Sequence, residues 1–235
     1  MNAAKASPAQ LQHLGQQAAQ RITTGMRVGL GSGRAAEAFV RALGERIKRE
    51  HLEIVGIPTS RATEAVAREV GIPLGDLDTV TALDIAMDGA DEVDTHLQLI
   101  KGGGGHLLRE KVIACMARQL IILVGFEKVV AHLGQVFPVF VEVVDFALPV
   151  VRRRLTDLGA TVSVRLDAAG AWYRTDNNNP LLHAQFPAPG YITDAVKLDA
   201  VLHTIPGVLE TGLFINLTDT VMIANADGSI STRKR

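Results

Sequence analysis

Residues 120–124 (Leu-Ile-Ile-Leu-Val) form the segment that most restricts the fold of this chain. An apolar run of that length is typical of a strand buried on both faces, as in a parallel sheet covered by helices. Further strand-like segments occur at 28–30, 54–57 and 83–87, and helix-like segments separate them. This alternation predicts an α/β fold with a mostly parallel sheet.

Several expected helices carry recognisable ends. Ser7 can cap a helix that begins at Pro8, and Gln10 can bond back to the cap. Gly71 is expected to end another helix. The sequence predicts helices over 8–21, 35–47, 61–70 and 106–118.

The pattern changes near residue 137, where shorter strand-like segments begin. The elements expected from there on are strands at 139–144, 161–166 and 171–175, a turn at 177–180, and helices at 149–158 and 194–205; a further strand, at 97–100, is expected before the helix at 106–118. The later part predicts a small α+β domain inserted into the first domain. Strands at 213–215 and 221–223 are expected to return to the main sheet.

The charge balance argues against some partners. There are 24 Lys and Arg against 25 Asp and Glu, so no basic face for nucleic acid is expected. No stretch approaches the roughly eighteen apolar residues of a membrane span, and residues 1–5 lack the apolar core of a signal peptide. We therefore expect a cytoplasmic protein with no nucleic-acid or membrane partner. Cys115, the single cysteine, lies in an apolar helix-like run and is expected to be buried.

A glycine-rich turn, Gly29-Leu30-Gly31-Ser32-Gly33-Arg34, follows the first strand. Glycines allow backbone N–H groups to approach an anion, and the following helix N-terminus favours negative charge. Arg34 stands where a dinucleotide fingerprint has its third glycine, which weakens that interpretation. A cation in the first helical turn opposes the helix dipole, so a bound anion would explain Arg34; a side chain turned into water explains it equally.

An acidic segment follows the strand at 83–87 and contains Asp88, Asp91, Glu92 and Asp94. Carboxylates at the carboxyl end of a parallel strand lie where α/β sheets bind ligands. Neighbouring acids raise one another's pKa, which suits acid–base chemistry. The spacing does not match a calcium loop, so a metal site is not predicted. A solvated acidic turn is the alternative.

A third motif begins at Lys101 and continues with four glycines. Such a run costs conformational entropy, and its expected function is a backbone site for an anion such as a phosphate or an enolate. Glu110 lies in the second turn of the helix that follows. These groups suit proton transfer between C2 and C1 of an aldose phosphate, which needs a carboxylate base and stabilised enediolate oxygens but no redox cofactor and no metal.

These segments also resemble a known family, the type A ribose-5-phosphate isomerases, which interconvert ribose 5-phosphate and ribulose 5-phosphate. The matching segments occur in family order over nearly the whole chain, at 28–33, 56–60, 88–92, 101–104, 108–111 and 212–214. The resemblance implies a Rossmann-like domain of residues 1–134 and 207–235 with a smaller α+β, ferredoxin-like lid of residues 135–206. It also implies a homo-oligomer, most often a dimer, without a cofactor.

The resemblance further implies residue roles. Glu110 would carry the proton, Lys101 would stabilise the enediolate, and Asp88 and Asp91 would bind sugar hydroxyls and assist ring opening. The residues expected to bind substrate are Gly31, Ser32, Gly33, Arg34, Thr59, Ser60, Gly102, Gly103 and Gly104.

The chain departs from the family pattern at the phosphate anchor. Two hydroxyl residues usually follow the glycine loop, but here Arg34 and Ala35 follow it. Many members carry a lysine on the first helix, where this chain has 11–13 (Leu-Gln-His). We hypothesise that Arg34 replaces both groups by binding the phosphate in bidentate fashion. The alternatives are an isomerase of a different small sugar phosphate, a non-catalytic sugar-phosphate-binding domain, and a nucleotide- or CoA-using enzyme.

Overall fold

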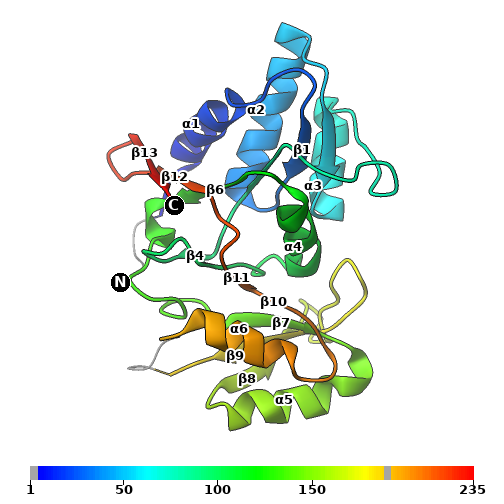
Figure 1. Cartoon of the computed structure of the whole chain (residues 1–235), viewed down its shortest axis with the longest axis vertical. Helices are drawn as coiled ribbons and strands as arrows, with labels where there is room; N and C mark the ends of the chain where they lie inside the picture. The colour runs from blue at the N-terminus through cyan, green and yellow to red at the C-terminus, as the bar shows by residue number, and fades with distance from the viewer. Residues whose placement is uncertain (1–4, 188–191) are drawn as a thin grey trace. The chain divides into compact units, whose positions relative to one another are not determined.

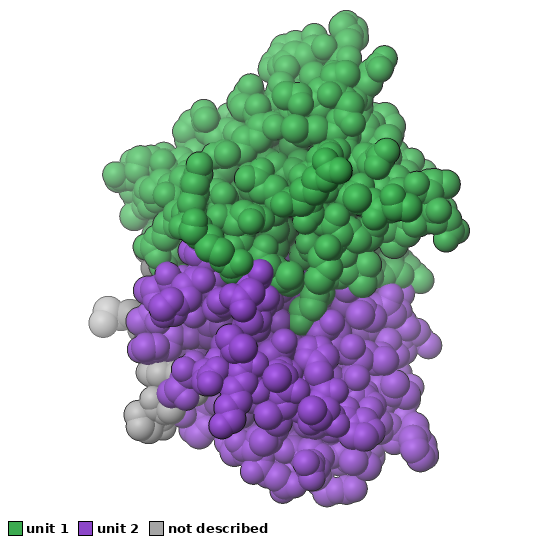
Figure 2. Space-filling view, viewed as in Figure 1, with its two compact units in different colours: residues 1–90, 109–129, 217–235 green, residues 91–108, 130–216 purple. Residues whose placement is uncertain are grey.

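The computed structural model describes residues 5–187 and 192–235; residues 1–4, part of the N-terminal segment discussed above, and 188–191 lie outside the described residues. The chain forms two compact units (Figure 2). The first contains 1–90, 109–129 and 217–235, and the second contains 91–108 and 130–216. The domain boundaries expected at 134/135 and 206/207 stay a prediction.

The first unit is built on a six-stranded sheet with the order β13-β12-β6-β3-β1-β2 (Figure 1). Its strands are β1 (Arg27–Leu30), β2 (Val55–Pro58), β3 (Ile85–Asp88), β6 (Leu120–Gly125), β12 (Thr220–Ala224) and β13 (Ile230–Lys234). All neighbouring strands are parallel except the antiparallel pair β12 and β13. The predicted α/β class with a mostly parallel sheet is confirmed.

The helices of this unit begin and end largely where local chemistry predicts. They are α1 (Pro8–Ala19), α2 (Arg34–Glu50), α3 (Arg61–Val70), the part of α4 (Leu107–Met116) from Arg109 onward, and the 3-10 turn η1 (Phe126–Lys128). Ser7 and Gln10 form a reciprocal capping box at the start of α1. Gly71 ends α3 in the left-handed conformation with φ 82°.

Both faces of the parallel sheet are covered, as its apolar strands require. Val28 and Leu30 of β1 belong to the same buried cluster as Phe39 of α2. Gly29 points to the other face, where a Cβ atom would come 2.6 Å from the Ile113 side chain of α4. Alternate residues of one strand therefore serve two helical layers, and helices follow the carboxyl ends of the strands.

The second unit contains a four-stranded antiparallel sheet with the order β10-β7-β9-β8. Its elements are β7 (Val139–Val143), the 3-10 turn η2 (Asp145–Ala147), α5 (Leu148–Asp157), β8 (Thr161–Val164), β9 (Leu181–Gln185), α6 (Ala195–His203) and β10 (Val208–Thr211). This β-α-β-β-α-β succession is the ferredoxin-like motif. A three-stranded sheet of β4 (Glu92–Val93), β5 (Leu99–Ile100) and β11 (Leu213–Phe214) also lies in this unit.

The strand expected at 171–175 is wrong, because that segment makes only the isolated bridges Leu166–Trp172 and Arg174–Pro180. The third strand of the sheet is β9. A buried carboxylate holds the loop between β8 and β9, since Thr175 of this loop donates its hydroxyl to Glu142 Oε1 at 2.9 Å.

Two further expectations are corrected. The strand expected at 213–215 does not join the main sheet, since Leu213 and Phe214 pair with β5 in antiparallel fashion. Cys115 is exposed rather than buried, because α4 turns Ile113 and Ala114 inward instead. Within the described ranges, no helix is both long and apolar enough to cross a membrane.

Candidate active site

The predicted site residues fall in both compact units. In the first unit, the turn from β1 to α2 brings its backbone against the end of β3. Gly31 donates its N–H to the carbonyl of Met87 at 2.9 Å. Gly33 precedes α2 with φ 88° and provides no side-chain cap. The first N–H groups of α2 therefore keep the anion-binding character expected of a helix N-terminus.

A cluster of four hydroxyl groups lies under this turn. Ser32 Oγ lies 2.8 Å from Thr59 Oγ1, 2.8 Å from Ser60 Oγ and 3.1 Å from Thr63 Oγ1. Thr63 in turn donates to the carbonyl of Gly31 at 2.9 Å. The structure thus brings Ser32, Thr59 and Ser60 together, while their contact with substrate stays a prediction. It adds Thr63, which the sequence analysis missed. Its signal is positional, since it stands three residues after Ser60, the N-cap of α3.

Asp88 and Glu110 are buried carboxylates of the first unit. Asp88 is 3% exposed, and its Oδ1 accepts the N–H of Ser32 at 2.9 Å and of Gly89 at 2.7 Å. These two bonds fix the orientation of the carboxylate. Glu110, in the second turn of α4, is 6% exposed. A carboxylate is rarely buried to this extent unless other groups stabilise it.

Arg34 begins α2 and extends from the turn toward the protein surface. Its side chain is 62% exposed, and Nη2 lies 3.8 Å from Oε1 of the mostly buried Glu127. An ion pair this long and exposed contributes little stability, so Arg34 remains able to bind another anion. Arg34 also lines a groove of about 370 Å³ together with Leu11 and Gln12 of α1. These two residues belong to the stretch 11–13 of the first helix, which the sequence analysis singled out.

In the second unit, Asp91 and Lys101 are held by the segments on either side of the glycine run. Asp91 Oδ2 accepts the N–H of Gly103 at 2.8 Å. Lys101 is 3% exposed, and its Nζ lies 5.4 Å from the centroid of the Phe214 ring, within range of a cation–π interaction. The backbone N–H of Lys101 donates to the carbonyl of Gly212 at 2.8 Å. A Cβ atom at Gly212 would collide with the Lys101 carbonyl.

The glycine run owes its composition largely to close packing. A Cβ atom at Gly102 would come 2.8 Å from Leu107, and one at Gly103 would come 2.8 Å from Asp91. At Gly105 it would collide with the hydroxyl of Tyr173. Close packing therefore accounts for these three glycines, and the backbone anion site stays a prediction.

Two side chains from the β8–β9 region bind the carbonyls of this run, and the sequence analysis missed both. Arg165 donates to the carbonyl of Gly103 at 3.0 Å, and Tyr173 donates its hydroxyl to the carbonyl of Gly104 at 3.2 Å. They lie more than sixty residues beyond the glycines, so no local pattern relates them. In residues 5–187 and 192–235, no three His, Cys, Asp or Glu side chains form a group that could hold a metal ion.

Comparisons with known proteins agree on one family. The family model of ribose 5-phosphate isomerase A (phosphoriboisomerase A) matches residues 55–228. The ribose-5-phosphate isomerase A of Thermomicrobium roseum is 46% identical over 212 residues, which are 90% of this chain and 88% of that protein.

Solved structures give the same result over nearly the whole fold. Ribose 5-phosphate isomerase A from Methanocaldococcus jannaschii has a TM-score of 0.91 at 38% identity, covering 97% of this chain and 98% of that chain. A D-ribose-5-phosphate isomerase solved in complex with phospho-erythronic acid has a TM-score of 0.92 at 36% identity, covering 96% of this chain and 98% of the other.

Proposed function

Since the chain belongs to the ribose 5-phosphate isomerase A family, we propose that Glu110 is the base of an aldose–ketose isomerisation between ribose 5-phosphate and ribulose 5-phosphate. Its carboxylate removes the proton from C2 of the open-chain aldose and leaves a cis-enediolate. The same proton is returned to C1, while O1 gains a proton and O2 loses one. Substrate and product are isomers, so the step consumes no oxidant or reductant.

The other buried charges take complementary roles in this proposal. The Lys101 ammonium stabilises the negative charge that develops on the enediolate oxygens. Asp88 and Asp91 accept hydrogen bonds from sugar hydroxyls and assist ring opening. The observation that carries the proposal is the burial of Lys101 at 3% exposure and Glu110 at 6% exposure. Burying a charged amine and a carboxylate costs free energy. Such residues are kept in a fold mainly where their charges serve a reaction.

The phosphate of the substrate is assigned to the turn that begins α2. The backbone N–H groups after Gly33 offer several donors to an anion. Arg34 supplies the cation there. Its exposure and the groove it shares with Leu11 and Gln12 support the idea that it replaces the lysine of related proteins. Thr59 and Ser60 keep Ser32 in place.

The wider setting is also proposed. We expect the protein to act in the cytoplasm, in the non-oxidative pentose phosphate pathway, and as a homo-oligomer, most often a dimer. The family membership supports these three expectations. Size-exclusion chromatography with light scattering tests the oligomeric state.

The decisive experiment follows conversion of ribose 5-phosphate to ribulose 5-phosphate in the presence of EDTA. Wild-type protein should be active, and Glu110→Gln should lose about a thousandfold in kcat. Glu53→Gln is the matched control, because Glu53 is exposed and lies in the same unit; it should keep full activity. Full activity of Glu110→Gln would refute the proposed base. A folded wild-type protein that is inactive would direct attention to Arg34, and other pentose and tetrose phosphates would then be screened.

A further inference from the structure

The N–H groups of the glycine run do not all face the same partners. Gly103 donates its N–H to Asp91, and Gly105 donates its N–H to the carbonyl of Gly102 at 2.8 Å. Between them lies the peptide that joins Gly103 and Gly104, whose carbonyl accepts from Arg165 at 3.0 Å. Because a trans peptide is planar, its C=O and N–H point in opposite directions. The N–H of Gly104 is therefore directed away from Arg165.

The next peptide is fixed at both of its polar ends. Its carbonyl, that of Gly104, accepts the Tyr173 hydroxyl, and its N–H, that of Gly105, bonds to Gly102. Burial raises the pKa of Tyr173, so its hydroxyl stays protonated and able to donate. With both flanking positions fixed, the peptide between Gly103 and Gly104 has little freedom to rotate.

Arg165 and Tyr173 also order one another. The guanidinium carbon of Arg165 lies 3.8 Å from the centroid of the Tyr173 ring, a stacking distance. A hydrogen bond from a charged donor polarises the peptide that accepts it, and this strengthens the N–H at its other end as a donor. A rigid, polarised N–H suits an oxygen that gains negative charge during a reaction.

We propose that Arg165 and Tyr173 are positioning residues that hold the peptide between Gly103 and Gly104. In this position the N–H of Gly104 donates a hydrogen bond to a sugar oxygen that gains negative charge when the enediolate forms. This inference rests on the proposed isomerase function and extends it by two residues. Neither side chain touches the reacting atoms in this scheme. Each acts through the backbone.

Kinetics of three variants test the role. Arg165→Gln should lower kcat by about 10- to 100-fold and change KM by less than about threefold, because the lost interaction forms in the transition state. Tyr173→Phe, which removes one neutral hydrogen bond, should lower kcat about fivefold. Arg165→Lys keeps the charge without the planar fork and should recover part of the loss. A raised KM with unchanged kcat in Arg165→Gln would overturn the inference.

The matched control is Arg174→Gln. Arg174 lies in the same unit, and its Nη1 contacts Asp145 Oδ1 at 2.6 Å on the surface. The control removes the same charge without touching the glycine run, so kcat should stay within about twofold of wild type. If Arg174→Gln lost as much kcat as Arg165→Gln, the loss would come from removing a positive charge and not from the contact of Arg165 with Gly103.

A second readout does not depend on activity or on the stability of Arg165→Gln. In protein labelled with ¹⁵N-glycine, the Gly104 amide is assigned by its loss in Gly104→Ala, and phospho-erythronic acid is added as the probe. Its carboxylate is a planar anion like the enediolate. The Gly104 amide proton should move downfield in wild type and less so in Tyr173→Phe.

The two proposals fail in different ways. If Glu110→Gln is inactive but Arg165→Gln has wild-type kcat, the positioning role is wrong and the isomerase proposal stands. If wild-type protein converts no ribose 5-phosphate, the isomerase proposal is wrong, and the response of the Gly104 amide to phospho-erythronic acid still decides the inference. An amide that does not respond overturns it.

Discussion

Gly31 packs so closely against Asp88 that a Cβ atom on Gly31 would come 2.5 Å from the carboxylate carbon of Asp88. This contact places the turn after β1 beside the end of β3, where Asp88 accepts the N–H of Ser32. Gly31 is not one of the glycines with positive φ, so its requirement is steric.

Gly31→Ala should therefore displace Asp88, since the new Cβ atom would collide with both its Cα and its carboxylate, without φ strain at residue 31. We expect kcat to fall on the order of a hundredfold, because small displacements of a catalytic group carry large rate penalties. The free energy of unfolding should fall by about 1–3 kcal/mol from overpacking. Steady-state kinetics and urea unfolding measure both effects.

Gly228→Ala is the comparison for that variant. Gly228 has φ 87° and open space around its Cα, so alanine there costs only backbone strain, about 1–2 kcal/mol. Its kcat should equal that of wild type. If Gly31→Ala behaved like Gly228→Ala, the contact with Asp88 would be irrelevant to the reaction.

Arg34→Ala tests the proposed phosphate anchor. Loss of a cation that binds the phosphate equally in ground and transition states should raise KM about tenfold and leave kcat within about twofold. Arg49→Ala removes the same charge from the far end of the same helix, where Arg49 pairs with Glu50. It should leave KM unchanged. An unchanged KM in Arg34→Ala would remove Arg34 from the substrate site.

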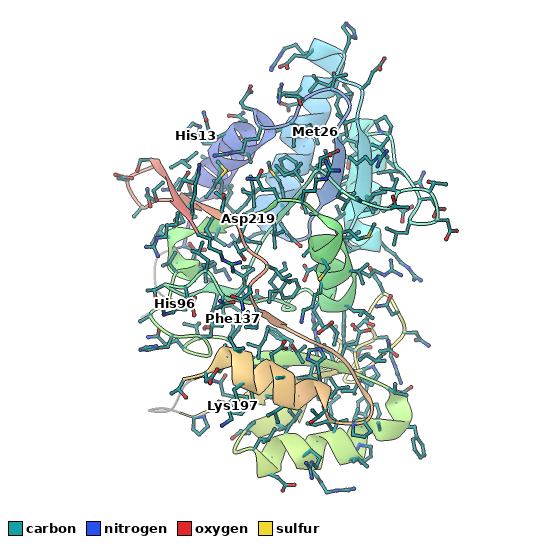
Figure 3. All side chains as sticks on the ribbon, viewed as in Figure 1. His13, Met26, His96, Phe137, Lys197 and Asp219 are labelled. Carbon is teal, nitrogen blue, oxygen red and sulfur yellow. The ribbon has the colours of Figure 1, made fainter. Side chains whose placement is uncertain are left out.

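Glu92→Gln tests whether the buried carboxylate of Glu92, in the acidic segment, stabilises the fold. Glu92 is fully buried and accepts backbone N–H groups from Gly134, Val136 and Phe137 at 2.6, 2.5 and 2.8 Å (Phe137 is labelled in Figure 3). An amide offers one acceptor oxygen and turns two donors toward these N–H groups. The free energy of unfolding should fall by about 3 kcal/mol. Thermal and urea unfolding measure it, and a wild-type value would show that the loop does not depend on the charge.

The elements predicted from the sequence are those with local causes. The capping box of Ser7 and Gln10 and the left-handed end at Gly71 depend on neighbours a few residues away. The choice between a strand at 171–175 and a strand at β9 depends instead on Glu142, some thirty residues earlier, whose buried carboxylate holds the intervening loop. No local pattern records that contact.

The site divides in the same way. Ser32, Ser60 and Asp88 could be predicted to lie together because the carboxyl ends of adjacent parallel strands meet at one edge of a sheet. The partners of the glycine run could not, since Arg165 and Tyr173 approach it only through the fold of the antiparallel sheet. The sequence analysis interpreted the glycines as an anion site, and nothing in their pattern indicated the close packing that the structure shows.

The stability of the fold should depend on pH through His183. Burial, and secondarily the positive charge of Arg165, lower the pKa of His183 from its ordinary value of 6.5. The unfolded chain therefore binds a proton at a higher pH than the folded chain does. Stability should be level above about pH 6.5 and fall as the pH drops from there toward the folded pKa. Urea unfolding from pH 8 to pH 5 measures this slope.

His183→Gln should flatten part of that slope, because the group that takes up the proton on unfolding is gone. His13→Gln, which changes an exposed histidine of α1 (labelled in Figure 3), is the matched control and should retain the wild-type slope. Other groups contribute to the total slope, so the comparison between the two variants decides. If both lose the same amount of stability between pH 6.5 and pH 5, the neutral form of His183 does not stabilise the fold.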